Sequence, residues 1–242
     1  MANELETRPV SRATTIRRRL IAAALLALAL FAGYMLWFRD SSLFAVEEVE
    51  VKGVTAHRAE IETALVRAAA GMTTLHVRDA ELREAVHGFP TVASIKADAT
   101  LLHRLEITVT ERLPVAEAEI HGDEVAISED GYILVDLPFE AGELPAIDAR
   151  SQGAGRLDPE GAAQAAIVGA APKPLRERIS ATSWDEERGG VVVELGGAPE
   201  LRFGDGERAE AKWSAAAAVL ADPDSLGATY VDVSVPDRTV VA

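Results

Sequence analysis

The sequence contains no cysteine, few aromatic residues and far fewer basic than acidic side chains. Without cysteine the chain has no disulfide framework, no thiolate metal ligand and no cysteine nucleophile. Lysine and arginine number 24 against 39 aspartate and glutamate residues, which gives a formal net charge of −15. Binding to nucleic acid requires basic side chains that neutralise phosphates, so this charge argues against nucleic acid as a partner.

The rest of the composition is that of a folded protein. Apolar residues make up 48% and charged residues 26% of the 242 positions, which excludes a wholly disordered chain. This length suits one large domain or two small ones beside the N-terminal segment described next.

Charge and hydropathy change sharply near the N-terminus. Residues 1–19 carry a balance of +3, and the rest of the chain carries −18. Residues 20–38 contain no charged side chain and as a helix would span roughly 28 Å, close to the ~30 Å hydrocarbon core of a membrane. A cleaved signal peptide and a buried core helix are the alternatives, but the run is longer than a signal peptide requires and lacks a small-x-small cleavage site. It predicts a single transmembrane helix with a cytoplasmic N-terminus and an extracytoplasmic body.

Hydrophobic periodicity after the apolar run predicts a small domain over residues 43–113. Apolar and polar side chains alternate, as in strands, near residues 48–52, 92–99 and 105–109. Between the first two of these stretches, apolar residues recur twice at helical spacing. The predicted order is strand, helix, helix, strand, strand, with both helices on one face of a small sheet.

Beyond Pro114 the pattern changes to short strands separated by turn-forming glycines. Asp158, followed by a proline, predicts the start of an alanine-rich helix. A second helix is expected near residues 207–221, and a last strand over residues 230–235. Residues 114–242 are thus expected to form a second domain built mainly on strands.

No pattern in the chain indicates catalysis, a metal or a cofactor. The five histidines form no metal-ligand pair, and neither a nucleophile elbow nor a Walker A loop is present. Residues 204–209 resemble the glycine-rich loop of dinucleotide-binding folds, but Asp205 and Glu207 place negative charge where the pyrophosphate would bind. That loop therefore predicts a tight turn whose carboxylates cap a helix. The chain is expected to be no enzyme, with no catalytic residue, metal, cofactor or small-molecule substrate.

Several segments, in order along the chain, resemble the FtsQ/DivIB family of bacterial cell-division proteins. A basic tail and an apolar run precede residues 44–53, which are similar to the first strand of that family's POTRA domain. Residues 105–116, Leu-Glu-Ile-Thr-Val-Thr-Glu-Arg-Leu-Pro-Val-Ala, resemble its most recognisable stretch. The further segments that carry the resemblance are Phe89-Pro90-Thr91-Val92, Asp130-Gly131-Tyr132, Leu144-Pro145, Lys212-Trp213 and Tyr230-Val231-Asp232-Val233.

The resemblance implies an α+β fold: a single transmembrane helix, a small βααββ POTRA domain, and a mixed β-sheet domain with two helices. The expected boundaries are a cytoplasmic basic tail at 1–19, the transmembrane helix at 20–38, the POTRA domain at 43–113 and the β domain at 114–242.

The function implied by the resemblance is that of a non-enzymatic bitopic scaffold of the bacterial divisome. Its expected partners are FtsB/DivIC-like and FtsL-like coiled-coil proteins and the septal peptidoglycan synthase complex. The expected location is the cytoplasmic membrane at the division septum, with the C-terminal domains outside the cytoplasm. A membrane-anchored POTRA interaction module outside division is the alternative. An anchored cell-wall hydrolase is disfavoured because no catalytic spacing is visible.

In that family the near-terminal strand region binds a partner whose strand adds to the sheet edge, and an exposed edge offers the unpaired backbone groups that this requires. The positions of this chain that fall in that region are Tyr230, Val233, Val235, Asp237 and Val240. The outer edge of the strand at 230–235 is expected to stay open. Because Pro236 cannot donate a hydrogen bond, pairing is expected to break there and to resume, if at all, along residues 239–241. An ordinary edge strand without a partner is the alternative for these positions.

Overall fold

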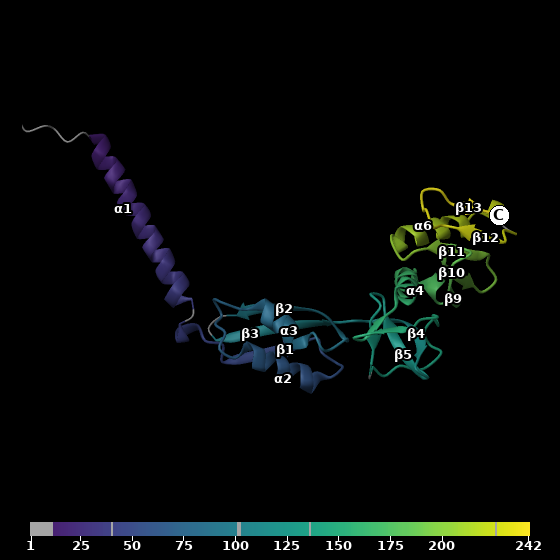
Figure 1. Cartoon of the computed structure of the whole chain (residues 1–242), viewed down its shortest axis with the longest axis horizontal. Helices are drawn as coiled ribbons and strands as arrows, with labels where there is room; N and C mark the ends of the chain where they lie inside the picture. Colours follow the sequence, from purple (N-terminus) through teal and green to yellow (C-terminus); the bar gives the residue numbers. More distant parts are fainter. Residues whose placement is uncertain (1–11, 40, 101–102, 136, 226) are drawn as a thin grey trace, which may run out of the picture.

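A computed structural model describes residues 12–39, 41–100, 103–135, 137–225 and 227–242. The elements follow one another along an elongated molecule, with helix α1 (Arg12–Gly33) at one end and a C-terminal sheet at the other (Figure 1). Most of the predicted cytoplasmic tail, residues 1–11, lies outside the described residues.

The predicted fold class included a transmembrane helix, and this part of the prediction is wrong. Within the part of the chain that the structure describes, no helix has both the length and the apolar character to cross a membrane. Helix α1 is charged up to Arg19, and after Gly33 the backbone changes to a short π-helix, η1 (Tyr34–Phe38). The apolar α-helical part, residues 20–33, spans only about 21 Å. What the described residues form is a mixed α/β structure with six α-helices and several sheets.

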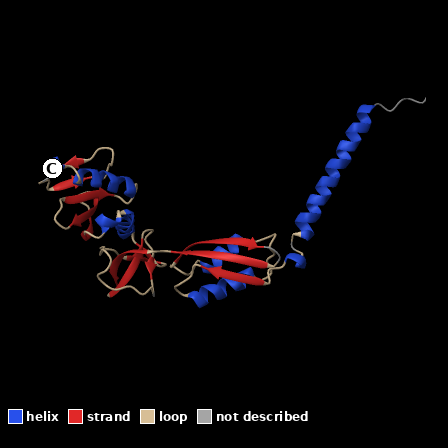
Figure 2. Cartoon of the chain, turned by 180° about the vertical axis from the view of Figure 1, so that it is seen from behind, coloured by secondary structure: helices blue, strands red, loops and turns tan. Residues whose placement is uncertain are grey.

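A three-stranded sheet and two helices follow η1. The sheet has the order β1-β3-β2, with β3 parallel to β1 and antiparallel to β2. Both helices lie on the same face of this sheet (Figure 2). The elements are β1 (Glu48–Lys52), α2 (Arg58–Ala69), α3 (Asp79–Val86), β2 (Val92–Thr100) and β3 (Arg104–Glu111).

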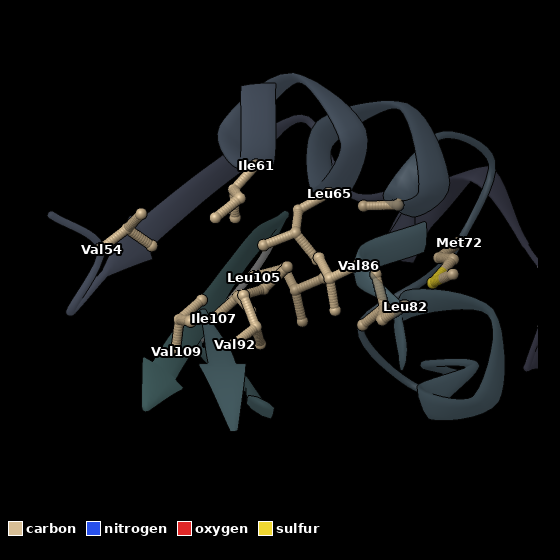
Figure 3. Packing of buried hydrophobic residues seen from close by; sticks show 11 residues of the cluster. Val54, Ile61, Leu65, Met72, Leu82, Val86, Val92, Leu105, Ile107 and Val109 are labelled. Carbon is tan, nitrogen blue, oxygen red and sulfur yellow. The ribbon is translucent and has the colours of Figure 1, made fainter. Parts of the chain in front are cut away.

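Alternation along β3 decides which side chains form the core under these helices. Leu105 and Ile107 are fully buried, whereas Glu106 and Thr108 point to the opposite face of the sheet. Leu105 and Ile107 meet apolar residues spaced four positions apart on each of the two helices (Figure 3). The helical members of this cluster shown there are Ile61, Leu65, Leu82 and Val86.

Glu111, the last residue of β3, holds the loop that leads into α2. Its carboxylate accepts hydrogen bonds from the backbone N–H groups of Thr55 and Ala56, at 2.8 and 2.9 Å, and from the Thr55 hydroxyl. Partial burial acts to raise the pKa of Glu111, but these hydrogen bonds outweigh it and hold the pKa below its usual range.

This depressed pKa predicts a pH-dependent contribution to stability. A carboxyl whose pKa is lower in the folded state stabilises the fold above its unfolded pKa, near 4.3, and the contribution is lost as the pH falls through the folded value. The free energy of unfolding of the unmodified chain should therefore fall more steeply between about pH 5 and pH 3 than that of a Glu111→Gln variant. Urea titrations across this range measure the difference. Glu119→Gln, at an exposed position of β4, is the control; parallel curves for the unmodified chain and Glu111→Gln would contradict the assignment.

The next sheet continues almost directly from β3 and has the order β4-β5-β6. Helix α4 packs over it, and Asp158 caps this helix, accepting a hydrogen bond from the Gly161 N–H at 3.1 Å. The elements of this part are β4 (Pro114–Ile120), β5 (Asp123–Ser128), β6 (Ile133–Leu134), β7 (Ser151–Gly153), β8 (Arg156–Leu157) and α4 (Pro159–Ala170).

The C-terminal part is a five-stranded sheet in the order β13-β12-β11-β10-β9. Helix α6 packs on it and also contacts α4, whose Ile167 belongs to this core while Ala165 and Val168 face the preceding one. The elements are α5 (Lys173–Arg176), β9 (Ile179–Asp185), β10 (Gly190–Leu195), β11 (Glu200–Gly204), α6 (Ala209–Leu220), β12 (Tyr230–Asp232) and β13 (Val240–Val241), with short 3-10 turns η2 (Ser42–Phe44) and η3 (Pro223–Ser225) elsewhere.

Candidate interaction surfaces

The C-terminal edge of the five-stranded sheet differs from its prediction. Strand β12 is three residues long and its outer edge is covered by β13, which pairs antiparallel to it with Val231 opposite Val241 and Asp232 opposite Val240. The Ala242 carbonyl accepts hydrogen bonds from the N–H groups of Thr229 and Tyr230, at 2.6 and 3.1 Å. The expectation of an open edge along residues 230–235 is therefore wrong. The chain turns after Pro236, and its last residues pair with β12 as strand β13.

The five predicted binding positions lie in different surroundings. Val233 is fully buried in the core, so a partner cannot contact its side chain. Tyr230 is half-buried and the Arg202 guanidinium stacks on its ring, 3.8 Å from the ring centre. Asp237 forms an ion pair with Arg208 at 3.2 Å. Val235 and Val240 are about half exposed, at 50% and 52%, and are the two predicted positions whose apolar side chains face solvent.

Two further residues belong to this edge and were not among the five predicted binding positions. Val241 is 44% exposed and lies opposite Val231, and Arg202 covers the Tyr230 ring from β11. The expected resumption of pairing along residues 239–241 is confirmed, because Val240 and Val241 form β13. Nothing in the sequence ties Arg202 to Tyr230, because that contact depends on the parallel pairing of β11 with β12.

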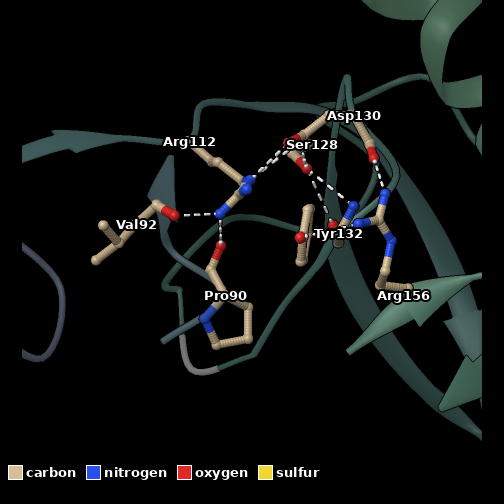
Figure 4. Close-up of polar contacts among 7 residues, drawn as sticks. All are labelled: Pro90, Val92, Arg112, Ser128, Asp130, Tyr132 and Arg156. Atoms are coloured by element: carbon tan, nitrogen blue, oxygen red, sulfur yellow. Dashed lines mark hydrogen bonds and ion pairs between the residues drawn. The ribbon is translucent and has the colours of Figure 1, made fainter. Parts of the chain in front are cut away.

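A second cluster joins the first sheet to the part that follows it (Figure 4). Arg112 lies between β3 and β4, and its side chain is only 11% exposed. Its Nε donates to the Asp130 carboxylate at 2.8 Å, and its Nη1 donates to the carbonyl oxygens of Pro90, at 2.8 Å, and of Val92. One guanidinium thus connects the start of β2 with the β5–β6 turn.

The Tyr132 ring lies between two guanidinium groups in this cluster (Figure 4). The Cζ atoms of Arg112 and Arg156 are 3.7 and 4.3 Å from the ring centre, and Arg156 also donates to the Tyr132 hydroxyl at 2.9 Å. Partial burial acts to raise the pKa of Asp130, but hydrogen bonds from Ser128 and Arg112 outweigh it and hold the pKa below its usual range. The cluster is a charged and aromatic clamp between consecutive parts of the chain.

The loop at 204–209 also differs from its prediction. Helix α6 starts at Ala209 with Arg208 before it, and no side chain of the described residues caps its first turn. The Asp205 carboxylate accepts instead from the Nζ of the buried Lys212, at 2.6 Å, and from the Glu207 N–H. The hydrogen bond from Lys212 holds the pKa of Asp205 below its usual range. Asp205 does not cap the helix because Lys212, one turn into it, binds that carboxylate.

No cluster of three or more potential metal ligands occurs among the described residues. A cleft of about 670 Å³ opens beside Arg112, and the exposed Leu113 lines it together with Ala166 and Gly169 of α4. Asp130, one of the three acidic residues that line the cleft, forms an ion pair with Arg112. The described side chains that line this cleft include no histidine, and the one hydroxyl among them, that of Ser128, donates to Asp130. The cleft and the sheet edge are therefore candidate surfaces for binding.

A scan against models of known protein families and a search among curated proteins both found no match for this chain. The interpretation of its function therefore depends on the geometry of these surfaces and on the resemblance of its segments.

Proposed function

We propose that the chain is a non-enzymatic scaffold of the bacterial divisome that captures an extended segment of a partner protein at the C-terminal edge of its five-stranded sheet. The observation that supports this most is that β13 is very short and covers β12 over only two residues. The partners that the resemblance suggests are FtsB/DivIC-like and FtsL-like proteins and, through them, the septal peptidoglycan synthase complex. The place of action is the division septum, and the position of the chain relative to the cytoplasmic membrane stays a prediction.

The energetics favour replacement of β13 by a longer strand. Val240 and Val241 remain about half exposed, so β13 gains little from apolar burial and is held mainly by a few backbone hydrogen bonds. Each such bond is worth a net 0.5–1.5 kcal/mol or so. A partner strand that pairs with β12 and contacts Tyr230 and Val235 as well replaces these bonds and adds side-chain burial. The ion pair between Arg208 and Asp237 is solvent-exposed and adds little to the hold of the turn.

A reversible cross-link tests whether β13 must leave β12. The chain has no cysteine, so the double variant Asp232→Cys/Val240→Cys introduces one defined pair of thiols. These residues lie directly opposite each other, and Cα atoms of paired antiparallel residues are about 4.5–5.5 Å apart, inside the range for a disulfide. The oxidised form should lose at least about tenfold in affinity for the FtsB/DivIC-like protein of the same bacterium, and reduction should restore it. Surface plasmon resonance with and without reductant measures both states.

Two controls separate the effect of the disulfide from the effects of the substitutions themselves. The single variants Asp232→Cys and Val240→Cys should bind equally with and without reductant. A chain shortened by residues 238–242 should bind at least as tightly as the unmodified chain, because the edge of β12 is then uncovered. Undiminished binding by the oxidised double variant would exclude this edge as the site.

A further inference from the structure

A short connecting segment, residues 41–47, leads from the end of helix α1 to the first three-stranded sheet (Figure 1). It contains the 3-10 turn η2 and stops where β1 begins at Glu48. The Ser41 hydroxyl accepts a hydrogen bond from the Leu43 N–H at 3.3 Å, which caps η2. The segment is thus folded by its own local hydrogen bonds and differs from an extended, solvated linker.

The loop that follows helix α2 binds the connecting segment and the end of α1. The Thr74 N–H donates to the Phe44 carbonyl at 2.8 Å. The Thr73 hydroxyl donates to the Arg39 carbonyl at 2.6 Å, directly after the π-helix η1. Thr73 is only 6% exposed, so water competes little for this hydrogen bond. The loop therefore holds the chain on both sides of the point where α1 passes into the segment.

The turn between β2 and β3 also binds the segment, through His103. Its carbonyl accepts hydrogen bonds from the N–H groups of Glu47 and Glu48, at 2.8 and 3.0 Å. Its ring Nδ1 donates to the Ala45 carbonyl at 2.8 Å. His103 has a φ of 79°, in the left-handed region that residues other than glycine seldom adopt. Such a conformation persists where the surroundings fix it, and here it lets one residue present both its carbonyl and its ring to the segment.

An aromatic contact continues from the end of α1 into the segment. The Phe38 ring, at the end of η1, lies 5.3 Å from the Phe44 ring, between centroids, and meets it edge to face. Phe44 thus packs its ring against the end of the helix, while its carbonyl accepts from the loop after α2. This single residue joins the helix to the domain that carries the first sheet.

We propose that residues 41–47 form a rigid coupler that makes α1 and the first three-stranded sheet move as one body. A flexible linker lets a helix change direction freely, whereas a segment bound at Thr73, Thr74 and His103 transmits a rotation or displacement of α1 to β1 and to the loop after α2. The coupler goes beyond the proposed function and does not depend on it, because the contacts that form it lie within residues 38–103 and not at the C-terminal sheet.

Distances between pairs of spin labels test this coupling, and the chain has no native cysteine to remove first. Labels at Leu30→Cys and Arg67→Cys join α1 to α2, and a reference pair at Arg67→Cys and Glu84→Cys lies within the domain of the first sheet; all three positions are exposed. Double electron–electron resonance is measured on the full chain in mild detergent, which covers the exposed apolar side chains of α1. The two pairs should give distance distributions of about equal width.

A chain with Gly-Ser-Gly-Ser inserted between Ser41 and Ser42 shows what a flexible connection looks like. The insertion leaves every residue of the sheet and its helices in place, and it should broaden the distribution of the α1–α2 pair at least about twofold. An unmodified chain whose distribution is as broad as that of the insertion chain would overturn the proposal.

The triple variant Phe44→Ser/Thr73→Val/His103→Gly removes the ring contact, the hydroxyl bond and the bond of the imidazole. Glycine adopts the φ found at position 103 without strain, so the β2–β3 turn keeps its shape. The variant should broaden the distribution of the α1–α2 pair at least about twofold and leave that of the reference pair unchanged.

The matched control is Leu43→Ser/Thr63→Val/His121→Gly. Leu43 is 67% exposed, the Thr63 hydroxyl bonds within its own helix, and His121 also has a left-handed φ, of 56°, but lies in the β4–β5 turn. This control should leave both distributions unchanged.

A triple variant with a distribution as narrow as that of the unmodified chain would also overturn the proposal, because the three contacts would then not hold the helix. A reference pair that broadens in the triple variant shows that this variant has lost its fold. In that case the comparison of the unmodified chain with the insertion chain decides the question alone.

Discussion

Replacement of Trp213 by alanine is expected to lower the free energy of unfolding by about 3–5 kcal/mol. The indole is 1% exposed and lies 4.6 Å from the Phe203 ring, between centroids, at the centre of the C-terminal core. Its Nε1 donates to the Ile167 carbonyl of α4 at 2.7 Å, so the substitution opens a cavity and leaves a buried acceptor without its partner. Since a domain is stable by only about 5–15 kcal/mol, the loss should unfold most of this part on mild heating.

Trp213→Phe separates the two contributions. Phenylalanine retains a ring against Phe203 but cannot donate to Ile167, so it should cost only about 1–3 kcal/mol. Urea denaturation followed by far-UV circular dichroism compares the three chains. A loss below about 1 kcal/mol for the alanine variant would contradict the placement of Trp213 at the centre of this core.

Replacement of Arg112 by methionine is expected to lower the free energy of unfolding nearly as much, through contacts at the junction between the first sheet and the β5–β6 turn. The guanidinium is mostly buried, pairs with Asp130 and binds the carbonyl oxygens of Pro90 and Val92. Methionine keeps much of the volume of the stem but leaves the two carbonyl oxygens without this donor, which should cost about 3 kcal/mol or more. Because the lost contacts join β2 to the β5–β6 turn, the junction should also become more mobile. Limited proteolysis should then cut near residues 112–114 faster than in the unmodified chain.

Arg156→Met is the matched control, because Arg156 stacks on the same Tyr132 ring from an exposed position. It should cost about 1 kcal/mol or less and leave the cleavage rate near 112–114 unchanged. Equal effects of the two substitutions would show that the ring stacking, and not the bonds of Arg112 to the first sheet, stabilises the junction.

Local pattern was a good guide to individual elements and a poor guide to their ends. The alternation of Leu105, Ile107 and Val109 predicted β3, and the Asp158-Pro159 pair predicted the start of α4. The last strand was predicted over residues 230–235 but ends at Asp232, although Val233 is still buried and its N–H bonds to Arg202. Val235 continues the alternation in sequence only, because it lies in the bend that leads into β13 and not in β12.

The apolar run near the N-terminus was the plainest failure. Hydropathy records how many residues lack charge, and residues 20–38 lack it throughout. It does not record helical geometry, and the change to a π-helix at Tyr34 shortens the apolar α-helix. The predicted transmembrane helix was wrong for this reason.

By itself, the sequence determined those features that depend on neighbours along the chain: the period-two strands, the helix spacing under Leu65 and Leu82, the cap at Asp158, and the exclusion of cysteine chemistry. Only the tertiary structure decided the features that depend on register between distant segments. These are the cover of β12 by β13 and the clamp of Arg112 on Asp130 and Tyr132. Side-chain period and capping act within a few residues, whereas a sheet edge is open or closed according to which strand folds back onto it, and hydropathy carries no information about that partner.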